Sequence, residues 1–233
     1  MGIFKLKPMN KLIEILQKQK NIKVIAPEIE YEDYVAFDLS APTTDKLNLP
    51  LTDADAFEDF VESHLTKNNS KVAYGGYLEH RNLYQRSTVF KDVNVEERNI
   101  HIGLDLWIKA GTDVLAALDG TIHSFQNNTA LGDYGPAIIL EHEIEGLTFH
   151  TLYGHLSLKS LDGKFEGQKV SKAEVIAQLG APPINGDYAP HLHFQIIKDM
   201  QGEKGDYPGV CSKTELEFYK ENCPDPNLLL QIK

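Results

Sequence analysis

Cysteine is scarce in this sequence, and no secretion signal accompanies it. The 233 residues include two cysteines, Cys211 and Cys223. The N-terminal stretch MGIFKLKPMNKLIEILQKQK has charged side chains within its apolar part, and no small-residue cleavage site follows it. We therefore expect reduced thiols and no disulfide framework. As given, the chain is expected to be cytoplasmic; if a leader had been removed, an extracytoplasmic location would follow.

Long apolar runs and an excess of positive charge are also missing. No apolar run approaches the roughly 18 residues of a membrane span, so membrane insertion is not expected. The 23 Lys and Arg residues are outnumbered by 34 Asp and Glu, which gives a net charge of −11. This charge argues against nucleic acid or an anionic membrane as the main partner. A neutral or cationic substrate agrees with it, and the oligomeric state is left open.

The N-terminal third is predicted to be an extension, residues 1–72, that packs on the main domain. Apolar periodicity predicts helices over 8–20 and 53–65, and Thr52 with Asp55 resembles a capping box. Loop or short strand is expected between them. Such an extension is also a candidate inhibitory segment that covers the active-site cleft.

From about Ala73 the sequence changes to short apolar runs separated by Gly, Asp and Asn. No spacing typical of βαβ units occurs, so a mostly β domain over 73–200 is expected, with an antiparallel sheet or sandwich. A C-terminal tail, residues 201–233, is predicted to contain a short helix that begins near Ser212 and runs to about Lys220.

Histidines in a fixed order dominate the second half of the chain, in HIGLD at 101–105, YGHLS at 153–157 and HLHF at 191–194. Because residues i and i+2 of a strand share a face, His191 and His193 should look into one space, as should Tyr153 and His155. Zinc binds imidazole nitrogen and carboxylate oxygen, and three protein ligands leave a position for water. The pattern predicts a zinc hydrolase with spare imidazoles. A two-histidine, one-carboxylate iron oxygenase is disfavoured, because its usual H-x-D spacing is absent.

The motifs HIGLD, LYGHLS and PHLHF, in this order, resemble the lysostaphin-type (LytM-type) zinc metallopeptidases of peptidase family M23. The resemblance extends from His101 to Ile197 and includes AGTDVLAALDGTIHSF and GDYGPAIILEH. It implies a lysostaphin-type β domain with one zinc ion per chain. Its implied zinc ligands are His101, Asp105 and His193, and its implied catalytic pair is His155 and His191, whose individual roles are left open.

Four further residues are candidates for substrate binding. Arg81 and Arg86 are suited to pairing with a substrate carboxylate, although surface arginines paired with acidic residues explain them equally well. Asp133 and Tyr134 lie in a loop expected to line the cleft. The histidines outside the motifs are expected to lie away from the metal; these are His64, His80, His123, His142 and His150.

The resemblance implies a zinc metallopeptidase that cleaves a peptide (amide) bond with a metal-activated water and two assisting histidines. Peptidoglycan peptides are substrates of this family. No leader or wall-binding module is visible, and APPINGDYAP replaces the family's usual glycine-, serine- and threonine-rich loop before the histidine pair. Two alternatives therefore stand beside the peptidase. One is a zinc amide hydrolase for a small cytosolic metabolite, and the other is a non-catalytic module that binds a peptide or a partner protein.

Overall fold

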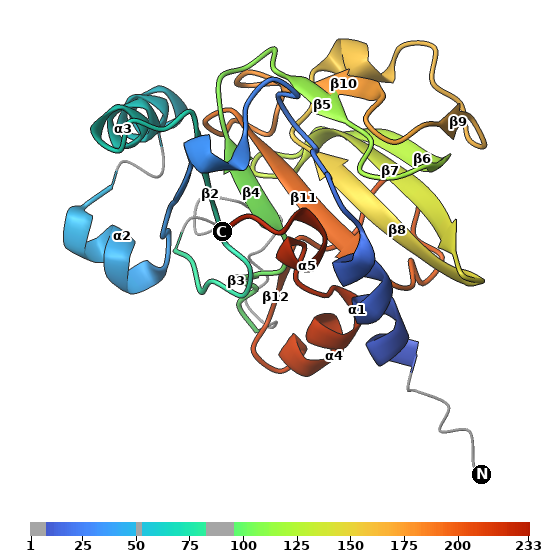
Figure 1. Cartoon of the computed structure of the whole chain (residues 1–233). Helices are drawn as coiled ribbons and strands as arrows, with labels where there is room; N and C mark the ends of the chain where they lie inside the picture. The colour runs from blue at the N-terminus through green and yellow to red at the C-terminus, as the bar shows by residue number, and fades with distance from the viewer. Residues whose placement is uncertain (1–7, 50–52, 83–95) are drawn as a thin grey trace.

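An eight-stranded sheet forms the centre of the molecule (Figure 1). The structure is a computed structural model that describes residues 8–49, 53–82 and 96–233. The strand pairs of this sheet are antiparallel except for β1 and β2, which run parallel. The predicted mostly β, antiparallel fold is confirmed. In spatial order the strands are β1 (Tyr34–Ala36), β2 (Val72–Gly75), β4 (Leu104–Trp107), β11 (His191–Ile197), β8 (Leu147–Gly154), β7 (Gly135–Ile144), β6 (Gly120–Asn128) and β9 (Lys169–Val170).

Two short strand pairs flank the large sheet. β5 (Asp113–Leu115) pairs with β10 (Val175–Gln178), and β3 (Ile100–His101) pairs with β12 (Val210–Cys211). Short 3-10 helices cover Tyr31–Asp33 and Leu158–Leu161. The α-helices are α1 (Pro8–Lys18), α2 (Ala41–Leu47), α3 (Ala54–Lys67), α4 (Leu216–Asn222) and α5 (Asn227–Leu230).

The helices predicted near 8–20, 53–65 and 212–220 correspond to α1, α3 and α4, whereas α2 and α5 were not expected. Pro42 suggested a loop, but proline is well tolerated in the first turn of a helix, and here it opens α2. The predicted capping box of α3 is wrong. Asp53 caps this helix, because its extended backbone lets its carboxylate accept a hydrogen bond from the Ala56 N–H at 3.1 Å. Thr52 lies outside the described residues.

Each face of the sheet packs on its own apolar cluster. The first cluster contains Leu192 and Phe194 of β11 together with Tyr153 of β8. The second cluster contains Ile197 of β11 and Leu152 of β8. Successive side chains of β11 point to opposite faces of the sheet, so His191, His193 and Gln195 lie on the same face as Ile197, which packs in the second cluster. The functional site therefore lies on the face that also contacts the C-terminal segment carrying α4.

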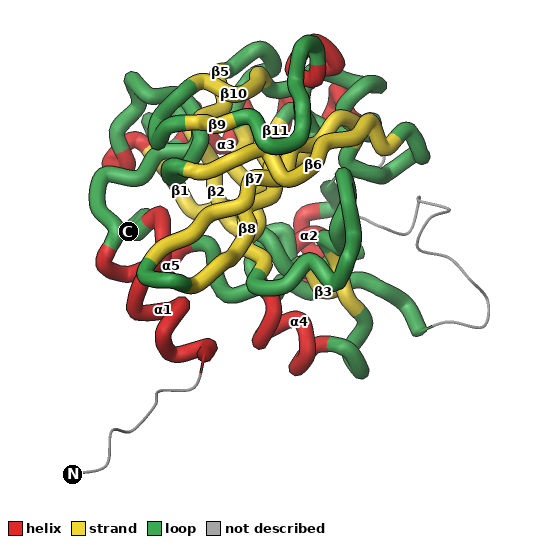
Figure 2. Tube along the Cα trace, turned by 90° about the vertical axis from the view of Figure 1, so that its right-hand side faces the viewer, coloured by secondary structure: helices red, strands yellow, loops and turns green. Residues whose placement is uncertain are grey.

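The N-terminal extension is part of the hydrophobic core. Leu12 and Leu16 of α1 are fully buried in the first cluster, beside α5, and Figure 2 shows α1 and α5 together at one side of the molecule. β1 adds a strand to the sheet, while Phe37 and Phe57 pack in a third cluster with Trp107. The borders assigned to the extension and to the C-terminal tail stay predictions.

This packing predicts the outcome of starting the chain at Lys71. The deletion removes Leu12, Leu16, Ile22, Val24 and Ile25, all at most 2% exposed. Burial of each such side chain contributes about 1.5–3 kcal/mol, so the sum is comparable with the whole stability of a domain, about 5–15 kcal/mol. We expect loss of the cooperative thermal transition and of soluble yield. A folded truncated protein with raised activity would instead support the inhibitory role of the extension.

Burial of His142 on β7 predicts a pH dependence of stability. The ring is 1% exposed and contacts the Asp119 carbonyl oxygen and Thr151 Oγ1, and burial lowers its pKa to about 4. The unfolded chain binds this proton near pH 6.5, so it holds more protons than the folded chain between these two values. Stability should therefore fall as the pH falls from about 6.5 to about 4, by roughly 3 kcal/mol from this residue.

Urea unfolding across this pH range tests the contribution of His142. His142→Gln should show a smaller fall in the free energy of unfolding than the wild type, by roughly 3 kcal/mol at the acidic end. His80→Gln, which replaces an exposed ring, should show the same fall in the free energy of unfolding with pH as the wild type. If His142→Gln also showed the wild-type fall, His142 would not be the source of this pH dependence.

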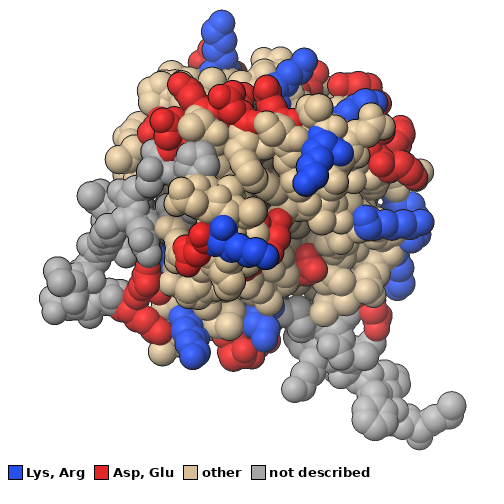
Figure 3. All heavy atoms as spheres, turned by 90° about the vertical axis from the view of Figure 1, so that its left-hand side faces the viewer, with Lys and Arg blue, Asp and Glu red and all other residues tan. Residues whose placement is uncertain are grey.

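Acidic side chains gather on the face of the molecule that carries α2 and α3, as Figure 3 shows. α3 itself contributes Asp55, Glu58, Asp59 and Glu62. Burial and repulsion from these neighbours raise the pKa of Glu58.

Candidate metal centre and its pocket

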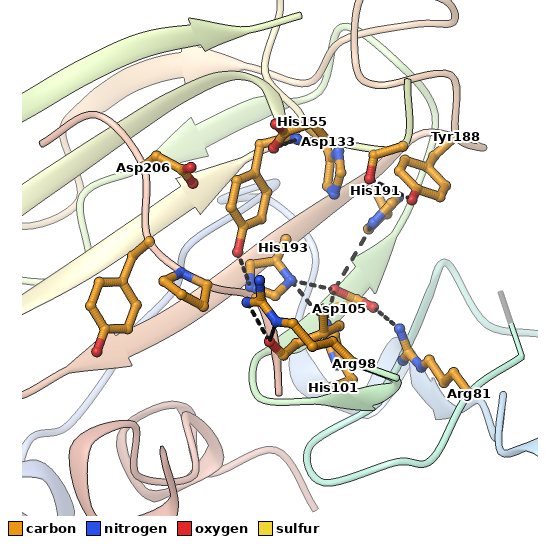
Figure 4. A pocket seen from close by; sticks show the side chains of 16 residues that line it. Arg81, Arg98, His101, Asp105, Asp133, His155, Tyr188, His191, His193 and Asp206 are labelled. Carbon is orange, nitrogen blue, oxygen red and sulfur yellow. Dashed lines mark hydrogen bonds and ion pairs between the residues drawn. The ribbon is translucent and has the colours of Figure 1, made fainter. Parts of the chain in front are cut away.

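The register of the central strands brings the predicted ligands together (Figure 4). On adjacent antiparallel strands, Asp105 of β4 lies opposite His193 of β11, and Trp107 lies opposite His191. His101 reaches the same place from β3. Among the described residues, His101, Asp105 and His193 form the one group of three potential ligands whose atoms all lie within 4.8 Å of one another.

Hydrogen bonds fix which ring nitrogen of each ligand histidine has a lone pair. His101 Nδ1 donates to the Gly76 carbonyl oxygen at 2.9 Å, since a carbonyl can only accept, and this leaves Nε2 as the ligand atom. Gln195 Nε2 donates to the Pro208 carbonyl oxygen, which turns Gln195 Oε1 toward His193. His193 Nε2 therefore donates to Gln195 Oε1 at 2.9 Å and leaves Nδ1 free as a ligand.

The spacing of the three ligand atoms suits zinc. His101 Nε2 lies 2.9 Å from His193 Nδ1 and 3.3 Å from Asp105 Oδ1, and His193 Nδ1 lies 3.1 Å from Asp105 Oδ1. A tetrahedral ion with bonds of about 2.0–2.1 Å holds its ligands about 3.3 Å apart. In the neutral forms of His101 and His193, both nitrogens of the 2.9 Å contact carry lone pairs and neither carries a proton. The two nitrogens therefore do not hydrogen-bond to each other, and together with the Asp105 carboxylate they are suited to binding a cation.

Electrostatics keeps the ligands in their metal-binding forms. Burial lowers the pKa of His101 to about 4, so its imidazole is neutral at physiological pH. Burial acts to raise the pKa of Asp105, but the positive charge of His101 when its ring is protonated and that of the Arg81 guanidinium outweigh it and hold that pKa well below the usual range.

Two glycines let the ligand rings approach the backbone. A Cβ on Gly103 would lie 2.4 Å from His193 Cε1. Gly76 has a φ of +110°, and a Cβ there would lie 2.8 Å from His101 Nδ1. Side chains at either position would displace a ligand ring, because each contact is shorter than real Cβ contacts.

His155 and His191 lie side by side next to the ligand group, with ring centroids 4.2 Å apart. His191 stacks on Trp107, and its Nε2 is 4.0 Å from Asp105 Oδ1. The expectation that His155 shares a face with Tyr153 is wrong. β8 ends at Gly154 and His155 has a φ of +61°, which turns its ring into the pocket, whereas Tyr153 is buried in the opposite cluster.

Carbonyl groups orient both of these rings. His155 Nδ1 donates to the Asn185 carbonyl oxygen and His191 Nδ1 to that of Ala189, each at 2.7 Å. Each Nε2 is therefore the proton-accepting atom of a neutral ring. Burial lowers the pKa of both rings, and for His155 the adjacent His191 and His193 lower it further. The Asp105 charge acts to raise the pKa of His191.

The APPINGDYAP loop, noted in the sequence as unusual, supplies these carbonyls. Asn185 is fully buried, and its side chain bonds to the Tyr188 backbone N–H and carbonyl oxygen, which closes the loop on itself. Sequence reasoning did not find the contribution of Asn185. It also missed Gln195, although Gln195 lies two residues beyond His193 on the same strand face, a spacing that could have indicated it.

The candidate substrate residues are placed differently from one another. Asp133 and Tyr134 line the pocket, and the Tyr134 hydroxyl is 3.4 Å from His193 Nε2. Arg81 also lines it, but its side chain is 1% exposed and pairs with Asp105 at 2.6 Å, so the carboxylate that it binds here belongs to the protein. Arg86 lies outside the described residues.

Residues that the sequence did not single out complete the pocket. Among the described residues its lining begins at Arg81, so no described part of the extension 1–72 contributes to it. The loop that follows β11 contributes Asp206, Tyr207, Pro208 and Gly209, and Tyr188 and Arg98 line other sides. The cavity has a volume of about 120 Å³.

Four further histidines contact groups outside the pocket. His64 Nε2 bonds to the Ala36 carbonyl oxygen, and His142 is held between β7 and β8. His123 and His150 contact each other, and His150 Nε2 lies 3.5 Å from Glu141. None of these four lines the pocket.

The sequence of this region matches a family model. Residues 99–206 match the model of peptidase family M23. This part of the chain belongs to peptidase family M23. The M23 domain thus contains His101, Asp105, His155, His191 and His193, whereas Arg81 and Gly76 precede it.

Similar proteins include two curated bacterial sequences. An uncharacterized metalloprotease of Haemophilus influenzae is 38% identical over 96 residues, which cover 41% of this chain and 18% of that protein. Stage II sporulation protein Q of Bacillus subtilis is 35% identical over 99 residues, which cover 42% of this chain and 32% of that protein. The chain thus spans a third or less of the length of these relatives.

The M23 domain is also similar to solved structures. The catalytic domain of lysostaphin from Staphylococcus simulans is 22% identical, with a TM-score of 0.38, and the match covers 66% of this chain and 94% of that chain.

In the part of the chain that the structure describes, no helix combines the length and apolar character needed to cross a bilayer.

Proposed function

We propose that this protein is a zinc-dependent metallopeptidase that hydrolyses a peptide (amide) bond. The observation that carries the proposal is the convergence of three ligand atoms and two neutral imidazoles in one pocket of a domain of peptidase family M23. His101 Nε2, Asp105 Oδ1 and His193 Nδ1 would hold one zinc ion per chain. When bound, zinc lowers the pKa of a water molecule and polarises a carbonyl group.

The imidazole pair is suited to moving the proton released by the attacking water. The rings are so close that a proton on one disfavours a proton on the other, and Asp105 favours protonation of His191. His191 Nε2 would take the proton from the water and deliver it to the leaving amine. His155 Nε2, which stays neutral, would orient the water by accepting a hydrogen bond from it.

The lining of the pocket suits a second candidate, a hydrolase of small amides. Tyr134, Tyr188 and Tyr207 line the pocket, and their rings offer apolar surface to a small acyl group. A cytosolic amide as substrate would agree with the location expected from the sequence. Peptidoglycan peptides remain the substrate class implied by the family resemblance.

A substrate screen tests the proposal. Zinc-loaded protein is incubated with glycine-containing peptides, cross-linked peptidoglycan peptides and small acylated amines, and new amine ends are detected by mass spectrometry. His155→Ala, treated in the same way, is the control for cleavage that does not depend on the proposed catalytic pair. Cleavage by the wild type alone supports hydrolysis, and the substrate that is cleaved chooses between the two candidates. Binding without cleavage of any compound would support the non-catalytic module.

A further inference from the structure

Two charged residues that precede the M23 domain, Glu79 and Arg81, are connected to its metal centre, since Glu79 contacts Arg81 and Arg81 contacts Asp105. We propose that Arg81, held in place by Glu79, is a positioning residue that binds one oxygen of Asp105 and so reserves the other oxygen for the metal ion. This inference rests on the proposed function, because it assigns a role toward the proposed zinc ion. It extends the centre beyond residues 99–206, the part of the chain that matches the family model.

The contacts of Arg81 divide the two Asp105 oxygens between different partners. Arg81 Nη1 lies 2.6 Å from Asp105 Oδ2, and both side chains are at most 2% exposed. Asp105 Oδ1 faces the two ligand imidazoles instead, at 3.1 Å from His193 Nδ1 and 3.3 Å from His101 Nε2. Figure 4 shows Arg81 approaching Asp105 from the side opposite His193.

Glu79 and the neighbouring backbone fix the direction of the guanidinium. Arg81 Nε lies 2.8 Å from Glu79 Oε2, while Glu79 Oε1 accepts a hydrogen bond from the Leu39 N–H at 3.3 Å. The Arg81 N–H donates to the Asn99 carbonyl oxygen, and Arg81 Cζ lies 5.7 Å from the centre of the Trp107 ring. Leu39, Glu79 and Arg81 therefore form a continuous link from the N-terminal extension to Asp105.

The consequence for the centre concerns the number of ligand atoms that the protein supplies. A carboxylate with both oxygens available can bind a metal ion through one or through both. A catalytic zinc site requires three protein ligand atoms and an open position. A short charge-assisted hydrogen bond to Oδ2 keeps that oxygen on the guanidinium, so Asp105 contributes one ligand atom and the position remains open.

Cobalt substitution provides a spectroscopic test on the full-length chain. Co²⁺ replaces zinc in such sites, and its visible absorption band weakens as the coordination number rises. Arg81→Met should release Oδ2 and weaken the band, and Arg81→Gln, which is polar but too short to span Glu79 and Asp105, should do the same if the methionine variant does not fold. Arg81→Lys should restore the band at least in part, because it keeps a charged donor.

A second arginine of the pocket serves as the matched control. Arg98 donates from Nε and Nη2 to the Val210 carbonyl oxygen, so Arg98→Met should leave the cobalt band unchanged. A variant that is merely less stable would show a lower melting temperature with a wild-type band. A wild-type band in a folded Arg81→Met or Arg81→Gln protein would overturn the proposal. Failure of the wild-type chain to bind Co²⁺ or Zn²⁺ would instead refute the proposed function.

Discussion

His193→Ala is expected to reduce bound zinc from about one ion per chain to none after dialysis, and to abolish hydrolysis. The substitution removes one of three ligand atoms and leaves Gln195 Oε1 without the ring that it orients. Two protein ligands do not hold zinc in a catalytic site, which requires three. Elemental analysis of the dialysed protein, with wild type treated in parallel, gives the zinc content directly.

The control for this result is a histidine outside the pocket. His123→Ala removes a partly exposed ring that contacts Ser124 and His150, and it should retain the wild-type zinc content. Retention of stoichiometric zinc by His193→Ala would mean that the ligand set is wrong. Thermal unfolding of both variants separates loss of the ion from loss of the fold.

His155→Ala is expected to give the second large effect, a fall in kcat of about 10²-fold with zinc content unchanged, because the attacking water would lose the group that orients it. His155 Nε2 faces the pocket, and the nearest ligand ring, that of His193, has its centroid 6.3 Å away. The ring therefore lies beside the ligand group rather than within it, at a place from which it would reach the attacking water. Steady-state kinetics on a substrate found in the screen, together with elemental analysis, measures the two quantities separately.

Comparison with the other member of the pair sharpens this prediction. His191→Ala should also keep zinc, but it should lose the acidic limb of the pH–rate profile if His191 carries the proton, because Asp105 favours protonation of that ring. Full activity in His155→Ala would show that this imidazole has no part in the reaction, and the proposed roles would then need to be reassigned.

Strand parity predicts one part of the site, the shared face of His191 and His193, whereas the ligand set comes from the family resemblance. His191 and His193 are two residues apart on one strand, so any extended backbone puts them on the same face. The same reasoning fails for His155, since it assumes that the strand continues through Gly154. A single residue with positive φ reverses the direction of the side chain, and no periodicity in the sequence signals this.

The sequence alone does not predict contacts between segments that lie far apart in the chain. The sequence leaves the partner of Arg81 open between a substrate carboxylate and the acidic residues of the protein, and only the fold shows that Asp105 is this partner. The shape of the 181–190 loop depends on the buried Asn185 side chain, whose partners lie within five residues but whose burial requires the sheet. The N-terminal extension packs on the domain as expected, and β1 agrees with the loop or short strand expected between its helices, but α2 was not predicted.

The division of the site between strands and loops has a consequence for how the pocket can diversify. The ligand residues lie on β3, β4 and β11, whereas Asp133, Tyr188 and Asp206 enter the pocket from loops. Sequence changes in these loops could alter which molecules are accepted while the ion-binding atoms keep their spacing. The 181–190 loop is the exception, because its Asn185 and Ala189 carbonyl groups orient His155 and His191. Grafting loops from other members of the family should therefore succeed more easily at 129–133 than at 181–190.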